Sequence, residues 1–211
     1  MDGDPTVFIV DDDPAARQEL VAMVKAGGCR VETYKSAERL LDRGEVWPPG
    51  CILADFETAG GKDPDLLKRL AAEDVRPPVV FLSADPVPRK VVRALRAGAL
   101  NFLEKPCQMA DLREAVREAL ALDAENRREH ARRARLQRRE AGLTPGEREV
   151  LDQMLAGRLN REIAVELGLS VRAVEVRRAK LMKKMRARSV AELVRMALAA
   201  AEPSEGSGET G

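Results

Sequence analysis

The sequence contains one histidine and three cysteines, and it has no long apolar run. The single histidine, His130, lies in a charged segment where we expect it to be solvated, and its isolation argues against a Ser-His-Asp triad or a zinc site. The odd number and wide spacing of the cysteines favour reduced core thiols over a disulfide or metal site; they are Cys29, Cys51 and Cys107. No segment approaches the roughly 18 apolar residues of a transmembrane helix, and the N-terminus has no signal-peptide pattern, so we expect a soluble, cytoplasmic protein without a membrane partner.

Positive and negative charges nearly cancel over the whole chain, but they do not cancel within each of its parts. The 211 residues have a net charge of +1, and with 45% hydrophobic residues the chain can bury one large core or two modest ones. Residues 1–122 carry a net charge of about −4, whereas residues 143–200 carry about +5. This division suggests two domains, of which the second is a candidate for binding nucleic acid.

The first 122 residues alternate between short apolar segments and segments with helical spacing. The apolar segments predict strands over residues 6–10, 29–34, 51–55, 78–84 and 99–105, and the others predict helices over 14–27, 36–43, 64–72, 86–97 and 108–122. Strands that are almost wholly apolar are typical of a parallel sheet covered on both faces, so we expect a doubly wound α/β domain with five parallel strands over residues 4–122. Asp13-Pro14 and Asp63-Pro64 each predict an N-cap followed by proline at the first helical position.

The remainder of the chain has no strand pattern. Residues 123–142 contain seven arginines and predict a helical linker, for which a solvated helix is favoured over one that contacts DNA phosphates. Residues 143–200 predict an all-α domain with helices over 145–156, 160–167, 171–185 and 189–200. Thr144 with Glu147 and Ser189 with Glu192 predict capping boxes, and Ser170 an N-cap. Residues 201–211 predict a disordered tail.

Charged and hydroxyl side chains follow four of the five predicted strands. They are Asp11, Asp12 and Asp13 after the first strand, Asp55 after the third, Ser83 after the fourth and Lys105 after the fifth. The carboxyl ends of the strands in an open α/β sheet form its ligand site. Clustered carboxylates suit Mg²⁺, a carboxylate can accept a phosphoryl group, and a lysine and a hydroxyl can balance the added charge. A strand-end carboxylate that only caps a turn is the alternative for each position alone.

These residues occur in motifs that resemble a response-regulator receiver domain, a flavodoxin-like fold. "VDDDP" is similar to the acidic-pair motif, "FLSA" to the switch-hydroxyl motif and "AGALNFLEKP" to the lysine-proline motif. The resemblance implies that Asp55 is the phosphoacceptor and that Mg²⁺ is held by Asp55, by Asp12 directly, by Asp11 through water and by the main-chain carbonyl of Glu57. It also implies that Ser83 and Lys105 bind the phosphoryl oxygens, that Phe102 is the switch aromatic, and that the Lys105–Pro106 bond is cis.

The loop after the expected acceptor departs from the family pattern. Receivers usually have methionine-proline where this chain has Thr58-Ala59, and glycine where it has Asp63. The loss of the proline makes the loop less rigid and the metal site less preorganised. Glu57 and Asp85 add acidic side chains near the acceptor, which could alter the lifetime of the phosphoryl group. "DFET" also faintly resembles the nucleophile loop of haloacid-dehalogenase-like phosphatases, but Glu57 replaces the second aspartate of that loop.

Residues 143–200 resemble a LuxR-type helix-turn-helix domain. The resemblance is carried by "LTPGEREVL", "NREIAVELGLS" and "AVEVRRAKLMKKM", with Arg177 at a position that is often histidine, and together with the receiver it points to the FixJ/NarL class of transcriptional regulators. In helix 171–185 the helical spacing predicts that Val174, Leu181 and Met185 pack inward. The candidate DNA-binding residues are Arg172, Glu175, Val176, Arg177, Ala179, Lys180, Lys183 and Lys184, with Arg177 and Lys184 expected to reach phosphates. A basic, solvated face of an ordinary helical bundle is the alternative.

We therefore expect a transcriptional response regulator. A sensor histidine kinase would donate a phosphoryl group to Asp55 with Mg²⁺, and the phosphorylated homodimer would bind double-stranded promoter DNA and could contact RNA polymerase. The last helix could mediate dimerisation or only complete its own core. No enzyme activity is expected beyond self-catalysed phosphoryl transfer to Asp55 and hydrolysis from it. Two alternatives are a phosphorylation-independent DNA-binding protein whose receiver is only an interaction module, and a phosphotransfer sink that never binds DNA.

Overall fold

The computed structural model describes residues 4–44, 47–59, 65–71 and 76–201 of the chain. The chain divides into two compact units, with the division after Arg128, and each unit is described by itself. Among the described residues, the helices are all too short or too polar to cross a membrane.

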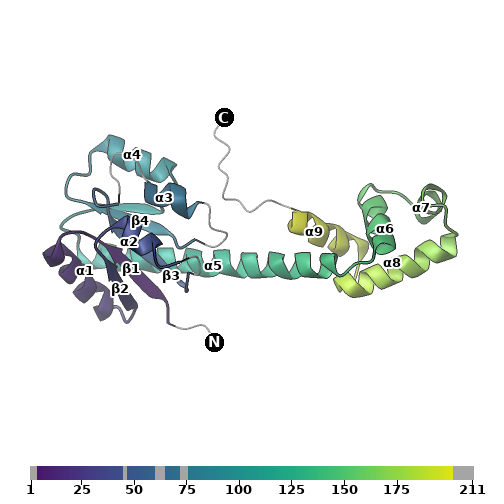
Figure 1. Ribbon diagram of the computed structural model, residues 1–211, viewed down its shortest axis with the longest axis horizontal. Coiled ribbons are helices and arrows are strands. Elements are labelled where there is room, and N and C mark those ends of the chain that lie inside the picture. Colours follow the sequence, from purple (N-terminus) through teal and green to yellow (C-terminus); the bar gives the residue numbers. More distant parts are fainter. Residues whose placement is uncertain (1–3, 45–46, 60–64, 72–75, 202–211) are drawn as a thin grey trace. The chain divides into compact units, whose positions relative to one another are not determined.

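A five-stranded parallel sheet forms the centre of the first unit (Figure 1). Its strand order is β2-β1-β3-β4-β5, and every neighbouring pair is parallel. The strands are β1 (Thr6–Val10), β2 (Arg30–Tyr34), β3 (Gly50–Asp55), β4 (Val79–Ser83) and β5 (Asn101–Glu104). The helices are α1 (Pro14–Ala26), α2 (Ala37–Leu41), α3 (Asp65–Leu70), α4 (Pro88–Arg96) and α5 (Met109–Ala141). The predicted doubly wound α/β fold is confirmed.

Alternate residues of the strands supply two separate cores, one on each face of the sheet. Strand residues such as Ile9 and Leu53 pack with α1 and α5, through side chains such as Leu20 and Leu112. Their sequence neighbours point to the other face and pack with residues of α2, α3 and α4; this set includes Phe8, Ile52, Phe81, Leu40, Leu66 and Ala94. Because the order of strands reverses between β1 and β3, the crevice at their carboxyl ends lies beside Asp11 and Asp55.

Most observed helix boundaries lie within two residues of the predicted ones, and two differences concern the fourth and fifth helices. The fourth helix begins at Pro88 rather than Pro86, with Val87 as its N-cap. The helix predicted to end at Leu122 instead continues without a break to Ala141, because the segment has neither glycine nor proline to stop it. The N-cap of α1 at Asp13 is confirmed, since its carboxylate accepts a hydrogen bond from the Ala15 amide. The proposed cap at Asp63-Pro64 lies outside the described residues, as does the tail after Ala201.

The segment expected to be a solvated linker is anchored by several buried contacts. Asp123 is 1% exposed, and its carboxylate accepts hydrogen bonds from the Gly50 amide (2.9 Å) and from Arg127 Nε (2.7 Å). The Arg127 guanidinium also donates to the carbonyl oxygens of Trp47 and Pro48. The expectation of a solvated helix is therefore wrong for Asp123 and Arg127, although His130 is exposed as predicted.

The cysteines are free thiols, as predicted. Cys51 lies fully buried in the sheet, where burial raises the pKa of its thiol to about 12. Cys29 and Cys107 are half-buried at the edge of the same core.

Four helices and the end of α5 form the second unit. They are α6 (Pro145–Leu155), α7 (Asn160–Glu166), α8 (Val171–Met185) and α9 (Val190–Ala201). Leu136 of α5 is buried in their shared core. Val174, Leu181 and Met185 are the buried residues of α8, which confirms the predicted inward stripe.

The predicted N-caps of the second unit are confirmed, except that the contacts of Ser189 and Glu192 do not form a complete capping box. The capping box of Thr144 and Glu147 is present, and Ser170 accepts a hydrogen bond from the Ala173 amide. Ser189 accepts from the Glu192 amide, but the Glu192 carboxylate accepts from the amide of Arg188, one residue before the position that a capping box requires.

Arg186 ends α8 in a left-handed conformation, with φ 58° and ψ 36°. This backbone conformation is costly for a residue with a Cβ atom, and glycine adopts it freely. We predict that Arg186→Gly raises the free energy of unfolding by about 0.5–1 kcal/mol. The matched control is Lys183→Gly, which places glycine inside the exposed last turn of the same helix and should lower it by about 1 kcal/mol. Urea unfolding of the full chain followed by circular dichroism measures both, and a less stable Arg186→Gly variant would contradict the prediction.

Candidate functional site

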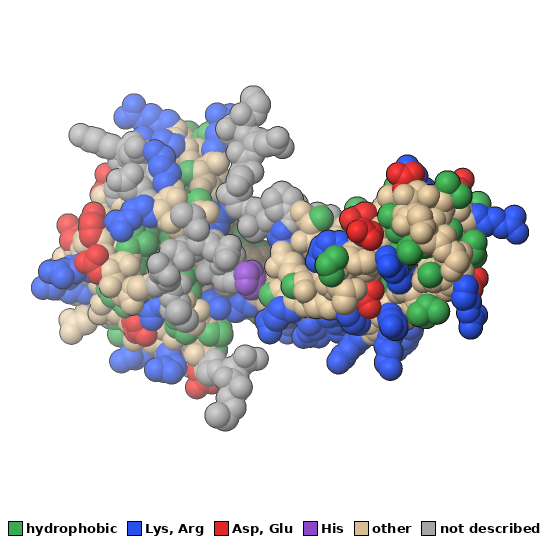
Figure 2. All heavy atoms as spheres, turned by 45° about the vertical axis from the view of Figure 1, so that its right-hand side comes forward, with side chains coloured by type: hydrophobic (Ala, Val, Ile, Leu, Met, Phe, Trp, Pro, Cys, Tyr) green, Lys and Arg blue, Asp and Glu red, His purple; other side chains and the backbone are tan. Residues whose placement is uncertain are grey.

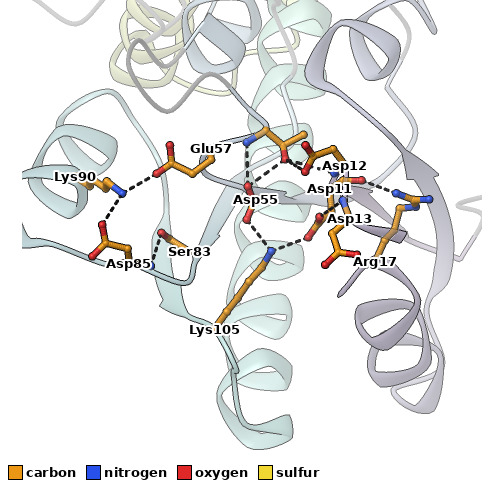
Figure 3. Close-up of polar contacts among 11 residues, drawn as sticks. Asp11, Asp12, Asp13, Arg17, Asp55, Glu57, Ser83, Asp85, Lys90 and Lys105 are labelled. Atoms are coloured by element: carbon orange, nitrogen blue, oxygen red, sulfur yellow. Dashed lines mark hydrogen bonds and ion pairs between the residues drawn. The ribbon is translucent and has the colours of Figure 1, made fainter. Parts of the chain in front are cut away.

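Four of the predicted site residues meet at the carboxyl edge of the sheet. Asp11 directly follows β1, Asp55 ends β3, Ser83 ends β4 and Lys105 directly follows β5 (Figure 3). The parallel arrangement brings these side chains to one edge from positions that are up to 94 residues apart in the sequence. The prediction that strand-end residues gather here is thus matched by the fold.

Lys105 lies between two carboxylates. Its Nζ atom is 2.6 Å from Asp11 Oδ2 and 2.7 Å from Asp55 Oδ1. Burial alone would raise the pKa of Asp55, but the hydrogen bonds from Lys105 and from the Thr58 amide outweigh it and hold that pKa below its usual value. Burial likewise acts to lower the pKa of Lys105, and the bonds to Asp11 and Asp55 outweigh it and raise that pKa. Asp55 is therefore an anion, and Lys105 a cation, at neutral pH.

Asp11 is committed to interactions inside the protein. Its side chain is about 1% exposed, and its second oxygen, Oδ1, accepts a hydrogen bond of 2.9 Å from the Asp13 amide. Arg17 donates from Nη1 to the main-chain oxygen of Asp11 at 2.6 Å. Because the Asp11 side chain is also more deeply buried than those of Asp55 and Asp12, this arrangement favours an indirect contact between Asp11 and a cation.

The donor set fits Mg²⁺ through Asp12 and Asp55. The exposed Asp12 carboxylate and the half-buried Asp55 carboxylate both lie within hydrogen-bond distance of one atom, Thr58 Oγ1, as two ligands of one cation must face a common point. Oxygen-only ligands of this kind suit Mg²⁺. The described residues contain no group of three His, Cys, Asp or Glu side chains that could hold a metal ion, and the main-chain carbonyl of Glu57 stays the predicted third protein ligand.

Ser83 ends β4, the strand beside β3, and Phe102 packs against the rings of Phe56 and Phe81. Ser83 is 1% exposed, and its hydroxyl accepts a hydrogen bond of 3.1 Å from the Asp85 amide. Phe102 is half-buried, with its ring centroid 5.3 Å from that of Phe56 and 6.4 Å from that of Phe81. The Lys105–Pro106 peptide bond is cis, as expected.

Two contacts at the site were not foreseen from the sequence. Lys90 of α4 contacts the carboxylates of Glu57 (2.7 Å) and Asp85 (3.1 Å), so the two acidic side chains expected near the acceptor are paired (Figure 3). Thr58, which the sequence marked only as a departure from a pattern, hydrogen-bonds to both Asp12 and Asp55. A hydroxyl three residues after the acceptor was the available signal for the second contact.

The candidate DNA-binding residues of α8 fall into two sets. Arg177 is half-buried and the other seven are exposed; six of these face away from the core as predicted, namely Arg172, Glu175, Val176, Ala179, Lys180 and Lys183, and the seventh is Lys184. Arg177 instead approaches Glu149, and Lys184 Nζ lies 2.6 Å from the buried Glu147 carboxylate and 3.2 Å from the Gly142 oxygen. Basic side chains are numerous on the surface of this unit (Figure 2).

Comparisons with known proteins identify both units. Residues 7–117 match the family model of the response regulator receiver domain, and residues 141–197 match that of the bacterial regulatory proteins of the luxR family. The chain is 40% identical to the transcriptional regulatory protein FixJ of Azorhizobium caulinodans, over 92% of each sequence. It is 36% identical to FixJ of Rhizobium meliloti, over 93% of this chain and 96% of that one. The solved structure of the response regulator StyR aligns with a TM-score of 0.77 at 34% identity, covering 93% of this chain and 99% of that one.

The position of Lys105 generates a prediction about Asp55. We expect Lys105→Met to raise the pKa of Asp55, because the variant keeps the burial and removes the cation that opposes it. The pair of Lys105 and Asp55 stabilises the wild type fully at pH values above the pKa that an aspartate has in the unfolded chain. This stabilisation is lost as the pH falls through the lower pKa of Asp55 in the folded protein. Carboxyl-carbon NMR titration of the full chain measures the pKa. The control is Lys90→Met, which removes a nearby lysine that contacts Glu57 and Asp85 instead; an unchanged pKa of Asp55 in Lys105→Met would refute the assignment.

Proposed function

The chain belongs to the two-component response regulators that join a receiver domain to a LuxR-type DNA-binding domain, and we propose that Mg²⁺-dependent phosphorylation of Asp55 switches its binding to promoter DNA. The observation that carries this proposal is the Asp55 carboxylate at the end of β3, ionised and held by Lys105 at 2.7 Å. An oriented, partly exposed carboxylate beside a lysine is what a phosphoryl acceptor needs.

The proposed reaction moves one phosphoryl group. An oxygen of Asp55 attacks the phosphorus of a phosphohistidine on a sensor histidine kinase, the new P–O bond forms as the P–N bond breaks, and the leaving imidazole keeps the electron pair and takes a proton from solvent. Lys105, already in contact with Asp55, binds a phosphoryl oxygen, and the Ser83 hydroxyl binds another. Mg²⁺, held by Asp12, Asp55 and the Glu57 carbonyl with Asp11 through water, would supply positive charge to the same oxygens. Beyond this self-catalysed transfer and the hydrolysis of the product, the protein has no catalytic role.

The added charge changes the surface through Ser83 and Phe102. To reach a phosphoryl oxygen, the Ser83 hydroxyl leaves the Asp85 amide, and Phe102 then turns toward the space that Ser83 vacates. These residues border α4, whose Val92 and Leu95 are 47% and 45% exposed. We propose that this face of α4 and β5 forms the interface of the phosphorylated homodimer. Val190 and Leu198 of α9 are also exposed and offer a second surface for dimerisation.

The second unit supplies the contacts to DNA. We propose that α8 enters the major groove with its exposed face, so that Lys180 and Lys183 reach phosphates while the candidate readers of base edges are Arg172, Glu175, Val176 and Ala179. Arg177 and Lys184 would reach phosphates only by giving up contacts to α6 and its preceding loop. RNA polymerase is a further proposed partner. Because the proposed target is promoter DNA, the proposed location of the protein is the cytoplasm. The proposed domain limits are 4–122, 123–142 and 143–200.

A second candidate function is DNA binding without phosphorylation, with the receiver acting only as an interaction module. The observation that favours it is the loop after Asp55, where Thr58 and Ala59 replace the usual methionine and proline. The next experiment separates the two candidates.

We predict that the wild-type chain gains one phosphoryl group when it is incubated with acetyl phosphate and Mg²⁺, and that Asp55→Asn gains none. Intact-mass spectrometry measures the adduct, and size-exclusion chromatography of the same samples should show a phosphate-dependent dimer only for the wild type. A folded wild-type protein without an adduct would reject the phosphorylation switch and favour the second candidate.

Adjacent lysines of α8 provide a matched test of the DNA contacts. We predict that Lys183→Gln weakens binding to any duplex and reduces the salt dependence of binding by about one counterion, with little effect on stability. Lys184→Gln should instead lower the thermal midpoint, because it leaves the buried Glu147 carboxylate without its cation.

The stability effect of Lys184→Gln has a defined pH dependence. The hydrogen bond from Lys184 is the main cause that holds the pKa of Glu147 at about 2. The stabilisation by this pair is therefore complete above the unfolded pKa of a glutamate and is lost as the pH falls toward about 2, so the difference between wild type and Lys184→Gln should close over that range. Thermal unfolding between neutral and acidic pH measures it, and a difference that persists at the acidic end would contradict the assignment.

A further inference from the structure

Thr58 connects the two carboxylates proposed to hold the metal. Its hydroxyl oxygen is 2.7 Å from Asp12 Oδ1 and 3.1 Å from Asp55 Oδ2, and its amide donates a hydrogen bond of 2.9 Å to the same Asp55 oxygen. These contacts join the loop after β1 to the loop after β3, 46 residues further along the chain.

The direction of the hydroxyl proton follows from a further contact. The Asp12 amide donates to Thr58 Oγ1 at 3.4 Å, which occupies a lone pair of the hydroxyl and leaves its single proton for a carboxylate. The shorter distance assigns that proton mainly to Asp12 Oδ1. Hydrogen bonds to ionised acceptors are stronger than neutral ones, so the hydroxyl stabilises the carboxylate of Asp12 while the Thr58 amide stabilises that of Asp55.

We propose that Thr58 is a positioning residue that stabilises the metal-free receiver and competes with Mg²⁺ for the carboxylates of Asp12 and Asp55. A cation held by both carboxylates would occupy the region between them where the hydroxyl proton of Thr58 now lies. Its binding would therefore break or weaken the hydrogen bond from Thr58. The bond therefore stabilises the metal-free state more than the metal-bound state. This inference deepens the proposed function and rests on its magnesium site.

The proposed competition predicts the direction in which loss of the Thr58 hydroxyl changes the affinity for Mg²⁺. Thr58→Val keeps the shape of the side chain and removes the hydroxyl, so it should bind Mg²⁺ about 3- to 10-fold more tightly than the wild type, which is the effect of one hydrogen bond to a partly exposed charged group. By linkage, the variant should unfold at a lower temperature than the wild type in the absence of divalent cations, and the gap should narrow at saturating Mg²⁺. Thr58→Ser keeps the hydroxyl and should remain close to the wild type in both measurements.

The experiment is a titration of the full chain with magnesium chloride, followed by the amide NMR signals of residues around Asp55, together with thermal unfolding with and without the metal. Thr33→Val, at an exposed threonine of β2, controls for the loss of a threonine hydroxyl elsewhere. Tighter binding in Thr58→Val, with Thr58→Ser and Thr33→Val unchanged, supports the inference. Unchanged or weaker binding in Thr58→Val overturns it, as does a Thr58→Ser variant that behaves like valine.

The two proposals can fail separately. If the wild type binds Mg²⁺ and accepts a phosphoryl group while Thr58→Val has the same affinity, only the role of Thr58 is overturned. If the folded wild type shows no response to Mg²⁺ at all, the proposed magnesium site is overturned and the role of Thr58 with it.

Discussion

The ammonium group of Lys105 lies between the carboxylates of Asp11 and Asp55, and the acidic edge of the sheet depends on this contact. Asp11 is almost fully buried, and a buried carboxylate without a partner costs several kcal/mol. The same cation holds Asp55 in its ionised form. Lys105 contacts both carboxylates, so a change of charge on Asp55 would also alter the interactions of Asp11. This coupling is the physical basis of the proposed switch.

Five acidic side chains at this edge of the sheet each contact a lysine or threonine side chain. Lys105 pairs with Asp11 and Asp55, Lys90 pairs with Glu57 and Asp85, and Thr58 bonds to Asp12. Phosphorylation would therefore exchange existing contacts rather than fill unsatisfied positions. The Ser83 hydroxyl, which accepts a hydrogen bond from the Asp85 amide, would take part in the proposed exchange. The free-energy difference between the two states is thus set by these contacts as well as by the phosphoryl group.

The fold and the principal site residues could be predicted because they depend on local patterns. Apolar strands with helical segments between them imply a parallel sheet, and the ends of such strands meet whatever the intervening sequence, so Asp11, Asp55 and Lys105 could be placed together. The contacts of Thr58 and Lys90 join separate loops and depend on side-chain directions that no sequence spacing encodes. The burial of Asp123 was missed because its partner, the Gly50 amide, lies in β3 and 73 residues away, whereas Arg127 is only four residues further along the same helix. In α8 the spacing identified the buried face, but it did not reveal that Lys184 pairs with Glu147 while its neighbour Lys183 is exposed.

The most direct test of a charge-driven switch at Asp55 is a crystal structure of the full chain with Mg²⁺ and the phosphoryl mimic beryllofluoride. A charge-driven switch predicts that beryllofluoride binds Asp55 and that Lys105 Nζ and the Ser83 hydroxyl contact its fluorine atoms. The hydrogen bond from the Asp85 amide to Ser83 should then be broken, and Phe102 should be turned inward. A structure with the mimic bound to Asp55, but with Ser83 still bonded to the Asp85 amide and Phe102 still in its present position against Phe56, would contradict it.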